Sequence, residues 1–247
     1  MKHFLWKAGT VYGYVFGWPM FRWFHYALIK VSLHGLGYDD PHCTGEERFI
    51  KGFLKDAGVR VCVDVGANVG GYTDSLLKAI PGVEVYAVEP AKATFAALKE
   101  RHGHEPSVHL YQLALSDTDG EVTFYSTRAL SETASLSPTG GDMTETVQAR
   151  TFDSFAELAG LTDVDLVKID TEGYEREILS TMSMRPRIVQ FEFNRDHLLR
   201  GVTLLSITQL LPGYRFYRLL PHGMVRIHPD KFIDNIFIFS NVIAVRE

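Results

Sequence analysis

Val61-Cys-Val-Asp-Val-Gly-Ala-Asn-Val-Gly-Gly-Tyr-Thr73 is the stretch of this sequence that decides the fold. Its apolar start predicts a β-strand that ends in the carboxylate of Asp64. The glycines that follow predict a tight turn, and a helical pattern begins at Gly71. A strand, a glycine turn and a helix in this order form a pocket for a nucleotide-like ligand at the carboxyl edge of a parallel sheet.

Strands and helices alternate along most of the chain around this turn. Apolar and β-branched runs predict strands at 60–65, 83–88, 108–114, 164–169 and 187–193. Helical patterns are found at 71–80, 91–102, 152–159, 175–182 and 204–211. Further strands are expected at 120–125, 146–152, 215–220, 223–227 and 236–245. The alternation predicts an α/β, Rossmann-like fold, in which a mostly parallel sheet carries helices on both faces.

Length, charge and cysteine content narrow the class of protein. A chain of 247 residues predicts one domain with an appendage. The net charge of -5 argues against a general nucleic-acid binder, so no nucleic-acid partner is expected. The two cysteines, Cys43 and Cys62, give no disulfide framework, which fits a reducing cytoplasm.

The N-terminal segment differs from the rest of the chain in charge and composition. Between residues 1 and 38 every charged side chain is basic, namely Lys2, Lys7, Arg22 and Lys30. The segment lacks the apolar core and cleavage site of a secretory signal, and its uncharged part, 8–21, is too short to span a bilayer. We therefore divide the chain into an aromatic, basic arm, residues 1–45, and a main domain, residues 46–247.

Two interpretations of this arm remain open. In the first, it is a helical arm whose aromatic side chains dock on the main domain or on a partner subunit, as in a homo-oligomer. In the second, its aromatic side chains lie at the headgroup level of a membrane, with its basic side chains near anionic lipid. The second interpretation would make a cytoplasmic protein peripheral to the membrane.

The glycine turn departs from the pattern that binds a dinucleotide. That fingerprint needs three glycines, and its second position is Asn68 here, which argues against a nicotinamide oxidoreductase. A carboxylate at the strand end, Asp64, suits a cationic ligand without phosphate, such as S-adenosylmethionine. Gly66 and Gly70 would let the backbone approach that ligand, and the Asn68 amide could pair with its charged end.

Two further strand ends supply candidate cofactor contacts. Glu89 ends the next predicted strand and is placed to accept hydrogen bonds from both ribose hydroxyls. Ser116 and Asp117 follow the strand after that and could bond an adenine amino group. The alternative for Asp117 is a purely structural one, in which it opens a turn.

Acids at the ends of two later strands are the candidates for catalysis. The candidates for a general base are, in order, Asp170, Glu172, Glu192 and His197. The same carboxylates would suit Mg²⁺ rather than zinc, an alternative that we do not favour. A structural alternative is an ion pair between Lys168 and Asp170, with Glu172 as a helix cap.

Taken in order, the motifs resemble those of FkbM-type methyltransferases. The matching segments are 64–70, 88–90, 114–117, 167–173 and 190–192. The resemblance runs from about residue 46 to the C-terminus. It implies the class I S-adenosylmethionine-dependent methyltransferase fold, a mostly parallel sheet with an antiparallel C-terminal strand. It also implies that Ser135, in the long connection 126–144, belongs to a lid over the cofactor or the substrate.

The resemblance further implies an S-adenosylmethionine-dependent O-methyltransferase. Its acceptor would be a hydroxyl, mostly of a sugar in a glycan, a glycolipid or a glycosylated natural product, and the sugar could be lipid-linked. The alternative is a non-catalytic S-adenosylmethionine-binding module that acts through the N-terminal arm.

Overall fold

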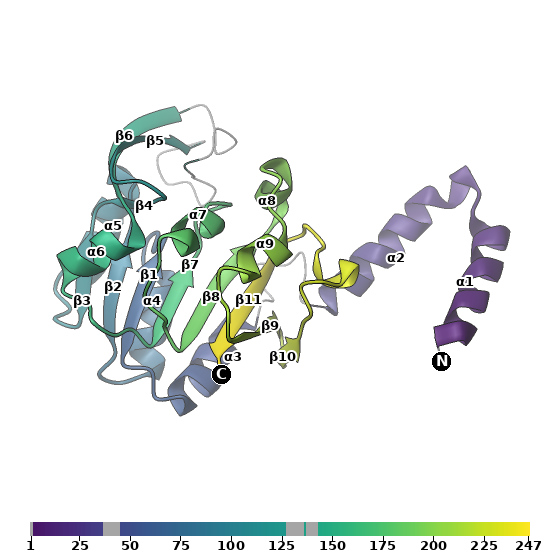
Figure 1. The fold of residues 1–247 in the computed structure, drawn as a ribbon, viewed down its shortest axis with the longest axis horizontal. Helices are drawn as coiled ribbons and strands as arrows, with labels where there is room; N and C mark the ends of the chain where they lie inside the picture. The colour runs from purple at the N-terminus through teal and green to yellow at the C-terminus, as the bar shows by residue number, and fades with distance from the viewer. Residues whose placement is uncertain (1, 37–44, 127–135, 137–142) are drawn as a thin grey trace.

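The computed structural model describes residues 2–36, 45–126, 136 and 143–247. Its centre is an eight-stranded sheet with the order β10-β9-β11-β8-β7-β1-β2-β3 (Figure 1). The strands in chain order are β1 Val61–Val65, β2 Glu84–Val88, β3 Val108–Tyr111, β7 Leu166–Ile169, β8 Ile188–Phe193, β9 Tyr214–Leu220, β10 Gly223–Arg226 and β11 Ser240–Arg246.

Most of this sheet is parallel, as the alternation predicts. The pairs β1–β2, β2–β3, β1–β7 and β7–β8 are parallel. The last strand, β11, lies between β8 and β9 and is antiparallel to both. The hairpin partner β10 is antiparallel to β9. The expected fold class is therefore confirmed, including the antiparallel C-terminal strand.

Helices cover both faces of the sheet because side chains of each strand alternate between two cores. Cys62 packs with α3 Glu46–Phe49, the following π-helical turn Ile50–Leu54, α4 Gly71–Ala79 and α5 Lys92–His102. The next residue, Val63, packs on the opposite side with α6 Phe152–Ala159, α7 Glu175–Ser180 and α9 Leu204–Thr208. A strand between two apolar layers of this kind reads as a nearly continuous apolar run.

A second sheet with the order β4-β6-β5 lies beside the main one. It consists of β4 Ala114–Leu115, β5 Gly120–Ser126 and β6 Met143–Arg150. The expectation of one strand over 108–114 is wrong, because the chain leaves the main sheet after Tyr111 and Ala114 pairs with Ala149 of β6. Phe124 and Val147 form a small core with Ala114. This contact between distant segments has no signature in local periodicity.

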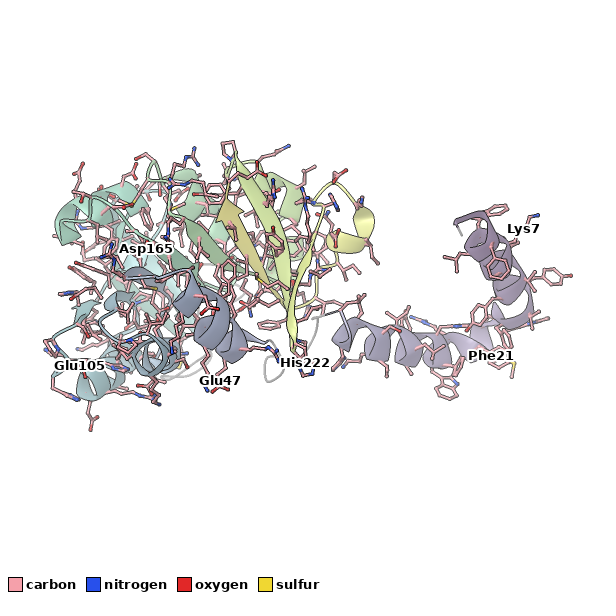
Figure 2. All side chains as sticks on the ribbon, turned by 90° about the horizontal axis from the view of Figure 1, so that it is seen from below. Lys7, Phe21, Glu47, Glu105, Asp165 and His222 are labelled. Carbon is pink, nitrogen blue, oxygen red and sulfur yellow. The ribbon has the colours of Figure 1, made fainter. Side chains whose placement is uncertain are left out.

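The N-terminal arm is helical, as expected, and projects away from the main domain (Figures 1 and 2). It consists of α1 Lys2–Phe16, a 3-10 turn Pro19–Phe21 and α2 Arg22–His34. Within the described part of the arm, Leu33 is the one buried residue. None of the helices in the described ranges has the length and apolar character that crossing a bilayer requires. The division of the chain at residue 45 stays a prediction, since residues 37–44 lie outside the described ranges.

Candidate active site

A cavity of about 390 Å³ lies at the carboxyl edge of the main sheet. The strand ends and the turns that follow them contribute Gly66, Asn68, Glu89, Asp170, Glu172 and Glu192 to its lining. The small sheet and the connection beyond it contribute Leu115, Phe124 and Leu136. The cavity therefore has polar walls at the strand ends and an apolar wall under the second sheet.

The glycines of the turn after β1 are required by the fold itself. Gly66 has a φ of +76°, and a Cβ there would lie 1.9 Å from the carbonyl oxygen of Asp170. Gly70 has a φ of +86°, and its Cβ would lie 2.5 Å from the His102 ring. Gly66 lines the cavity, whereas Gly70 is absent from its described lining. Gly70 therefore serves the turn into α4, and a direct cofactor contact at that residue stays a prediction.

Glu89 is held at the cavity wall by backbone donors. Its carboxylate accepts hydrogen bonds from the backbone N–H groups of Asn68 and Ala91, each at 3.0 Å. Burial raises the pKa of Glu89 to about 7, although these two hydrogen bonds oppose the shift. Asn68 itself adopts a φ of +50°, and its side-chain oxygen accepts from the N–H of Val69 at 2.7 Å. The turn thereby positions Glu89, and both residues line the cavity.

Lys168 links Asp64 to the cavity. Its Nζ lies 3.4 Å from Asp64 Oδ1 and 3.2 Å from Asp170 Oδ2. Asp64 is fully buried and also accepts from Thr73 Oγ1 at 3.0 Å. Burial acts to lower the pKa of Lys168, but the carboxylates of Asp170, Asp64 and Glu46 outweigh it and raise that pKa. Lys168 lines the cavity and Asp64 does not, so Asp64 acts there through the lysine.

Glu46 is a cavity residue that the sequence motifs do not indicate. It begins α3 and accepts a hydrogen bond from Gln190 Nε2 at 2.5 Å, although 144 positions separate the two residues. Gln190 is fully buried and accepts from the Tyr72 hydroxyl at 2.9 Å. Burial raises the pKa of Glu46. The hydrogen bond from Gln190 therefore positions Glu46, and Glu46 itself lines the cavity.

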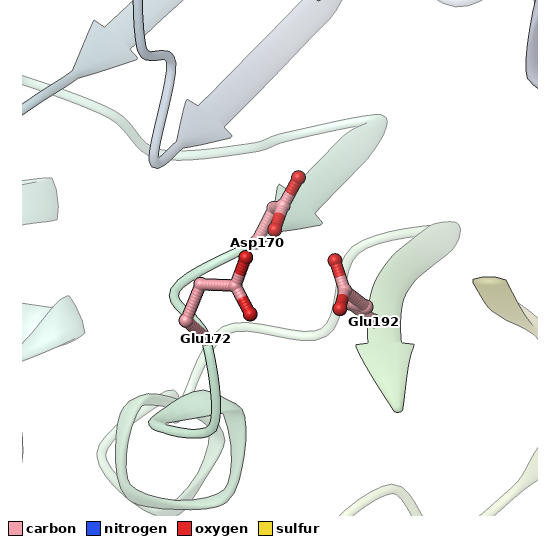
Figure 3. A group of neighbouring side chains, drawn as sticks. All are labelled: Asp170, Glu172 and Glu192. Atoms are coloured by element: carbon pink, nitrogen blue, oxygen red, sulfur yellow. The ribbon is translucent and has the colours of Figure 1, made fainter. Parts of the chain in front are cut away.

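Three candidate catalytic acids meet at one point of the cavity wall. Carboxylate oxygens of Asp170, Glu172 and Glu192 lie within 4.8 Å of one another, as Figure 3 shows. Asn194 Nδ2 donates to Glu172 at 2.9 Å and to Glu192 at 2.6 Å. Glu172 adopts a φ of +53°, a left-handed backbone conformation that residues other than glycine adopt only at an energetic cost. This backbone directs the Glu172 carboxylate toward those of Asp170 and Glu192.

The three acids differ in their affinity for protons. Burial, followed by the charge of Asp170, raises the pKa of Glu172 to about 8 and that of Glu192 well above its ordinary value. Burial opposes ionisation of Asp170 as well, but Lys168 and a hydrogen bond from Glu192 hold its pKa below the ordinary value. The cluster thus combines Asp170, which loses its proton more easily than an ordinary aspartate, with two carboxyl groups that hold their protons more tightly than an ordinary glutamate.

Of the structural alternative for these acids, the ion pair of Lys168 and Asp170 is present, whereas Glu172 does not cap α7. Tyr174 is the N-cap residue of α7, and it makes no side-chain capping bond. Glu172 bonds Asn194 instead. The left-handed backbone at Glu172 turns its side chain away from α7 and toward the cavity. Local spacing could not reveal this, because the partner Asn194 lies on a different strand end.

A second cavity, of about 440 Å³, adjoins the first at the acid cluster. Both cavities are lined by Glu172, Glu192 and Phe239. The second cavity is further lined by Asn194, Arg195, Asp196, Phe237 and Ile238. The acids therefore stand where the two spaces meet, so a group bound in one can approach a group bound in the other.

His197 lies behind this wall rather than on it. Its side chain is fully buried, its Nε2 lies 2.8 Å from Glu175 Oε2, and its Nδ1 lies 3.3 Å from the Asn194 backbone nitrogen and side-chain oxygen. It lines neither described cavity. It belongs to the short helix α8 Arg195–Leu199, which the sequence patterns did not predict. The contacts make His197 a support for Asn194, which itself bonds two of the acids.

The residues that were expected to contact the adenine or to form the lid are not found in the described lining of the cavity. Ser116 is buried and donates to Asp117 at 3.1 Å, and neither lines the described cavity, although Leu115 just before them does. Their adenine role stays a prediction. Ser135 lies outside the described residues, while its neighbour Leu136 lines the cavity.

Asp170, Glu172 and Glu192 are also the one group of three acids or histidines in the described chain that could hold a metal ion. Their oxygens suit Mg²⁺. Lys168 pairs with Asp170, however, and Asn194 donates to both Glu172 and Glu192. These contacts use part of the donor set, and magnesium remains an alternative that we do not favour.

Comparison with known proteins agrees with this geometry. The family model of the methyltransferase FkbM domain matches residues 64–217, more than half of the chain. The 2-O-methyltransferase NoeI of Sinorhizobium fredii is 23% identical over 66% of this chain and 76% of its own length. The hexuronic acid methyltransferase AglP of Haloferax volcanii is 28% identical over 68% of each chain.

A third relative is the 31-O-demethyl-FK506 methyltransferase FkbM of Streptomyces tacrolimicus, which is 32% identical over 49% of this chain and 58% of its own. Membership in the family implies S-adenosylmethionine as the cofactor. The glycine cradle, the buried Glu89 and the surplus of acids around Lys168 fit a cationic ligand that carries a ribose. The chain belongs to the FkbM family of methyltransferases and has the class I methyltransferase fold.

Proposed function

We propose that this enzyme methylates a hydroxyl group of a sugar. The observation that carries the proposal is the meeting of two cavities at Glu172 and Glu192, two members of the cluster of three acids. Two relatives support it, since one is a 2-O-methyltransferase and the other is a hexuronic acid methyltransferase. Because the family is one of enzymes, the alternative of a non-catalytic binding module is set aside.

The first cavity is assigned to S-adenosylmethionine, which supplies an electrophilic methyl group on a sulfonium ion when it is bound. Glu89 would accept hydrogen bonds from the ribose hydroxyls, and Leu115 with Phe124 would pack against the base. Asp170, Asp64 and Glu46 surround Lys168, and Asp170 and Glu46 line the cavity beside it. Three acids around one lysine favour a cationic ligand.

The second cavity is assigned to the acceptor sugar. Phe237 and Phe239 supply apolar surface to it, while Glu172, Glu192 and Asn194 supply hydrogen-bonding groups. A sugar ring has C–H groups on its faces and hydroxyls on its rim, so it needs both kinds of surface. The arrangement would direct one hydroxyl toward the junction of the cavities, where close and aligned approach accounts for much of the rate of a transfer reaction.

Glu172 is assigned as the group that accepts the hydroxyl proton. A general base works best when its pKa lies near the working pH, and that of Glu172 is raised to about 8. Asp170, the first candidate from the sequence, is a weaker base because Lys168 holds its pKa low. Asp170 and Glu192 then act as hydrogen-bond partners that orient Glu172 and the substrate.

Comparative mass spectrometry of glycans tests this function. Cells that lack the protein should lose the mass of one methylene from a specific sugar residue, and the wild-type chain should restore it. The E172Q variant should fail to restore it although it still binds S-adenosylmethionine. Glycans that are identical in deleted and wild-type cells would contradict the sugar assignment. Activity that EDTA abolishes and Mg²⁺ restores would overturn the metal-free assignment of the acid cluster.

A further inference from the structure

The N-terminal arm combines a strong charge bias with exposed apolar surface. Residues 1–36 of the arm contain four lysines and arginines and no acid, so this segment carries +4 within a chain of net charge -5. Residues 37–247 therefore carry -9. All three tryptophans of the protein lie in the arm, and Trp6, Trp18 and Trp23 are 69%, 64% and 71% exposed.

Most large apolar side chains of the arm are exposed in the described structure. Seventeen of them are exposed between residues 4 and 36, against seven in the rest of the described chain. Those seven are distributed over β6, α6, α8, α9, β10 and the 3-10 turn Phe232–Asp234. Figure 2 shows the side chains of the arm extending into open space, with Lys7 and Phe21 labelled. The described residues of the main domain therefore expose far fewer large apolar side chains than the arm does.

The two helices of the arm distribute their apolar side chains differently. In α1, Phe4, Val11 and Val15 follow one another at helical spacing, and Lys7 lies in the same row, three residues after Phe4 and four before Val11, while further exposed apolar side chains surround the helix. In α2, Phe24, Leu28 and Val31 share a face.

A basic stripe runs along the other side of α2. Arg22, Tyr26, Lys30 and His34 are spaced by four residues, which places them in one row. The Arg22 guanidinium donates to the Tyr26 hydroxyl at 3.2 Å and lies 5.2 Å from the centre of its ring. The arm thus combines exposed apolar side chains with basic side chains on both helices.

We propose that this arm binds the surface of an anionic lipid membrane. Both helices would lie in the plane of the interface, with apolar side chains in the lipid and their basic side chains near the headgroups. Exposed tryptophans suit this depth, because the indole ring is apolar and its N–H is polar. A second copy of the chain fits less well, since its own basic arm repels this one and the described residues of its main domain expose only seven large apolar side chains, spread over several elements.

Tryptophan fluorescence of the full-length protein tests the proposal directly, because every tryptophan reports on the arm. Vesicles of phosphatidylcholine with phosphatidylglycerol should shift the emission to shorter wavelength, and vesicles of phosphatidylcholine alone should shift it much less. Added salt should reverse the shift, since it screens exposed charges. An emission spectrum that anionic vesicles leave unchanged would overturn the proposal.

Two matched pairs of substitutions test which lysines contribute to vesicle binding, in a co-sedimentation assay with the same vesicles. The double substitution K7Q and K30Q should weaken binding roughly 30-fold, since each basic residue near an anionic surface contributes about fivefold. The matched control, K51Q and K78Q, removes two exposed lysines of the main domain and should leave binding unchanged. Equal losses in both pairs would show attraction by net charge alone and overturn the assignment to the arm.

The oligomeric state of the protein distinguishes binding to a membrane from binding to a second copy of the chain. Sedimentation velocity without lipid should give a monomer for the wild-type chain and for the W18A and W23A double variant. A wild-type dimer that this double variant dissociates, without any vesicle binding, would assign the arm to a second copy instead. The cavity residues take no part in these measurements, so the result is independent of the proposed acceptor.

Discussion

Glu172 shows how one residue can combine backbone strain, burial and charge. Its φ of +53° directs the carboxylate into the space where two cavities meet, and Asn194 holds it there. Neighbouring acids and burial keep its pKa at about 8. A strained backbone at such a point is often part of the function, because the surrounding structure must hold it in place.

Replacing Glu172 by Gln should lower kcat by about 100-fold, the lower end of what general-base catalysis contributes. For the wild-type enzyme, kcat/KM should rise with pH and level off above the pKa of about 8, since only the ionised carboxylate accepts a proton. The variant should lose that pH dependence, and calorimetry should find its affinity for S-adenosylmethionine little changed. A wild-type pH profile retained by E172Q would assign the proton transfer to another group.

Glu46 and Glu47 form a matched pair for testing the cofactor cavity. Both acids lie in the first turn of α3, but Glu46 lines the cavity and Glu47 is exposed beside Lys51. The E46Q variant should bind S-adenosylmethionine about tenfold more weakly, as expected for a lost bond to a charged group. The E47Q variant should bind it as the wild type does. Equal affinities in isothermal titration would exclude Glu46 from cofactor binding.

At the scale of elements, the crossing of the β1 turn with the end of β7 determines the shape of the cavity. The turn passes so close to β7 that position 66 has no room for a side chain. Paired strand ends bring Asp64 beside Lys168 in register, and Lys168 opposite Gln190. The polar side of the site therefore depends on strand register, because a slip by one residue would turn every one of these side chains to the other face.

Gly66→Ala should destabilise the protein by at least about 3 kcal/mol, because the backbone is left-handed there and the added carbon meets a carbonyl oxygen. The thermal midpoint should fall by roughly 6 °C or more. Gly71→Ala is the control, since nothing lies within 4 Å of a Cβ at that position and its φ is ordinary. Equal midpoints for the two variants would contradict the close approach described for the turn.

At the scale of the whole molecule, the protein retains buried acids in the neutral form. Glu89 and Glu172 have pKa values of about 7 and 8, against 4.5 for an ordinary glutamate. Between pH 4.5 and 8 the folded state therefore binds more protons than the unfolded state. The stabilisation from these groups is complete below pH 4.5 and is lost as pH rises through 7 and 8.

The thermal midpoint of the ligand-free protein should consequently fall by at least about 5 °C between pH 5 and pH 8. Differential scanning calorimetry across that range measures it. The double variant E89Q and E172Q, whose amides do not titrate, should show a flatter dependence. A midpoint that rises over this range in the wild type would mean that both acids are ionised in the folded state.

The sequence alone predicts most of the strands and helices of the main sheet and several of the acids that line the cavity. Alternating strands and helices specify a parallel sheet, and the carboxyl ends of parallel strands meet at one edge. Acids at those ends, Glu89, Asp170 and Glu192, are thereby brought to one cavity. The helical arm and its basic character likewise follow from local composition.

Only the tertiary structure decided which residues complete the site and which do not reach it. Glu46 reaches the cavity because Gln190, 144 positions away, holds it. His197 is enclosed behind Asn194, and Phe237 and Phe239 form the second cavity beside the acids. Such contacts join segments far apart in the chain, so they depend on how the elements pack and on strand register. Local sequence specifies the elements and their ends, whereas packing determines which side chains share a cavity.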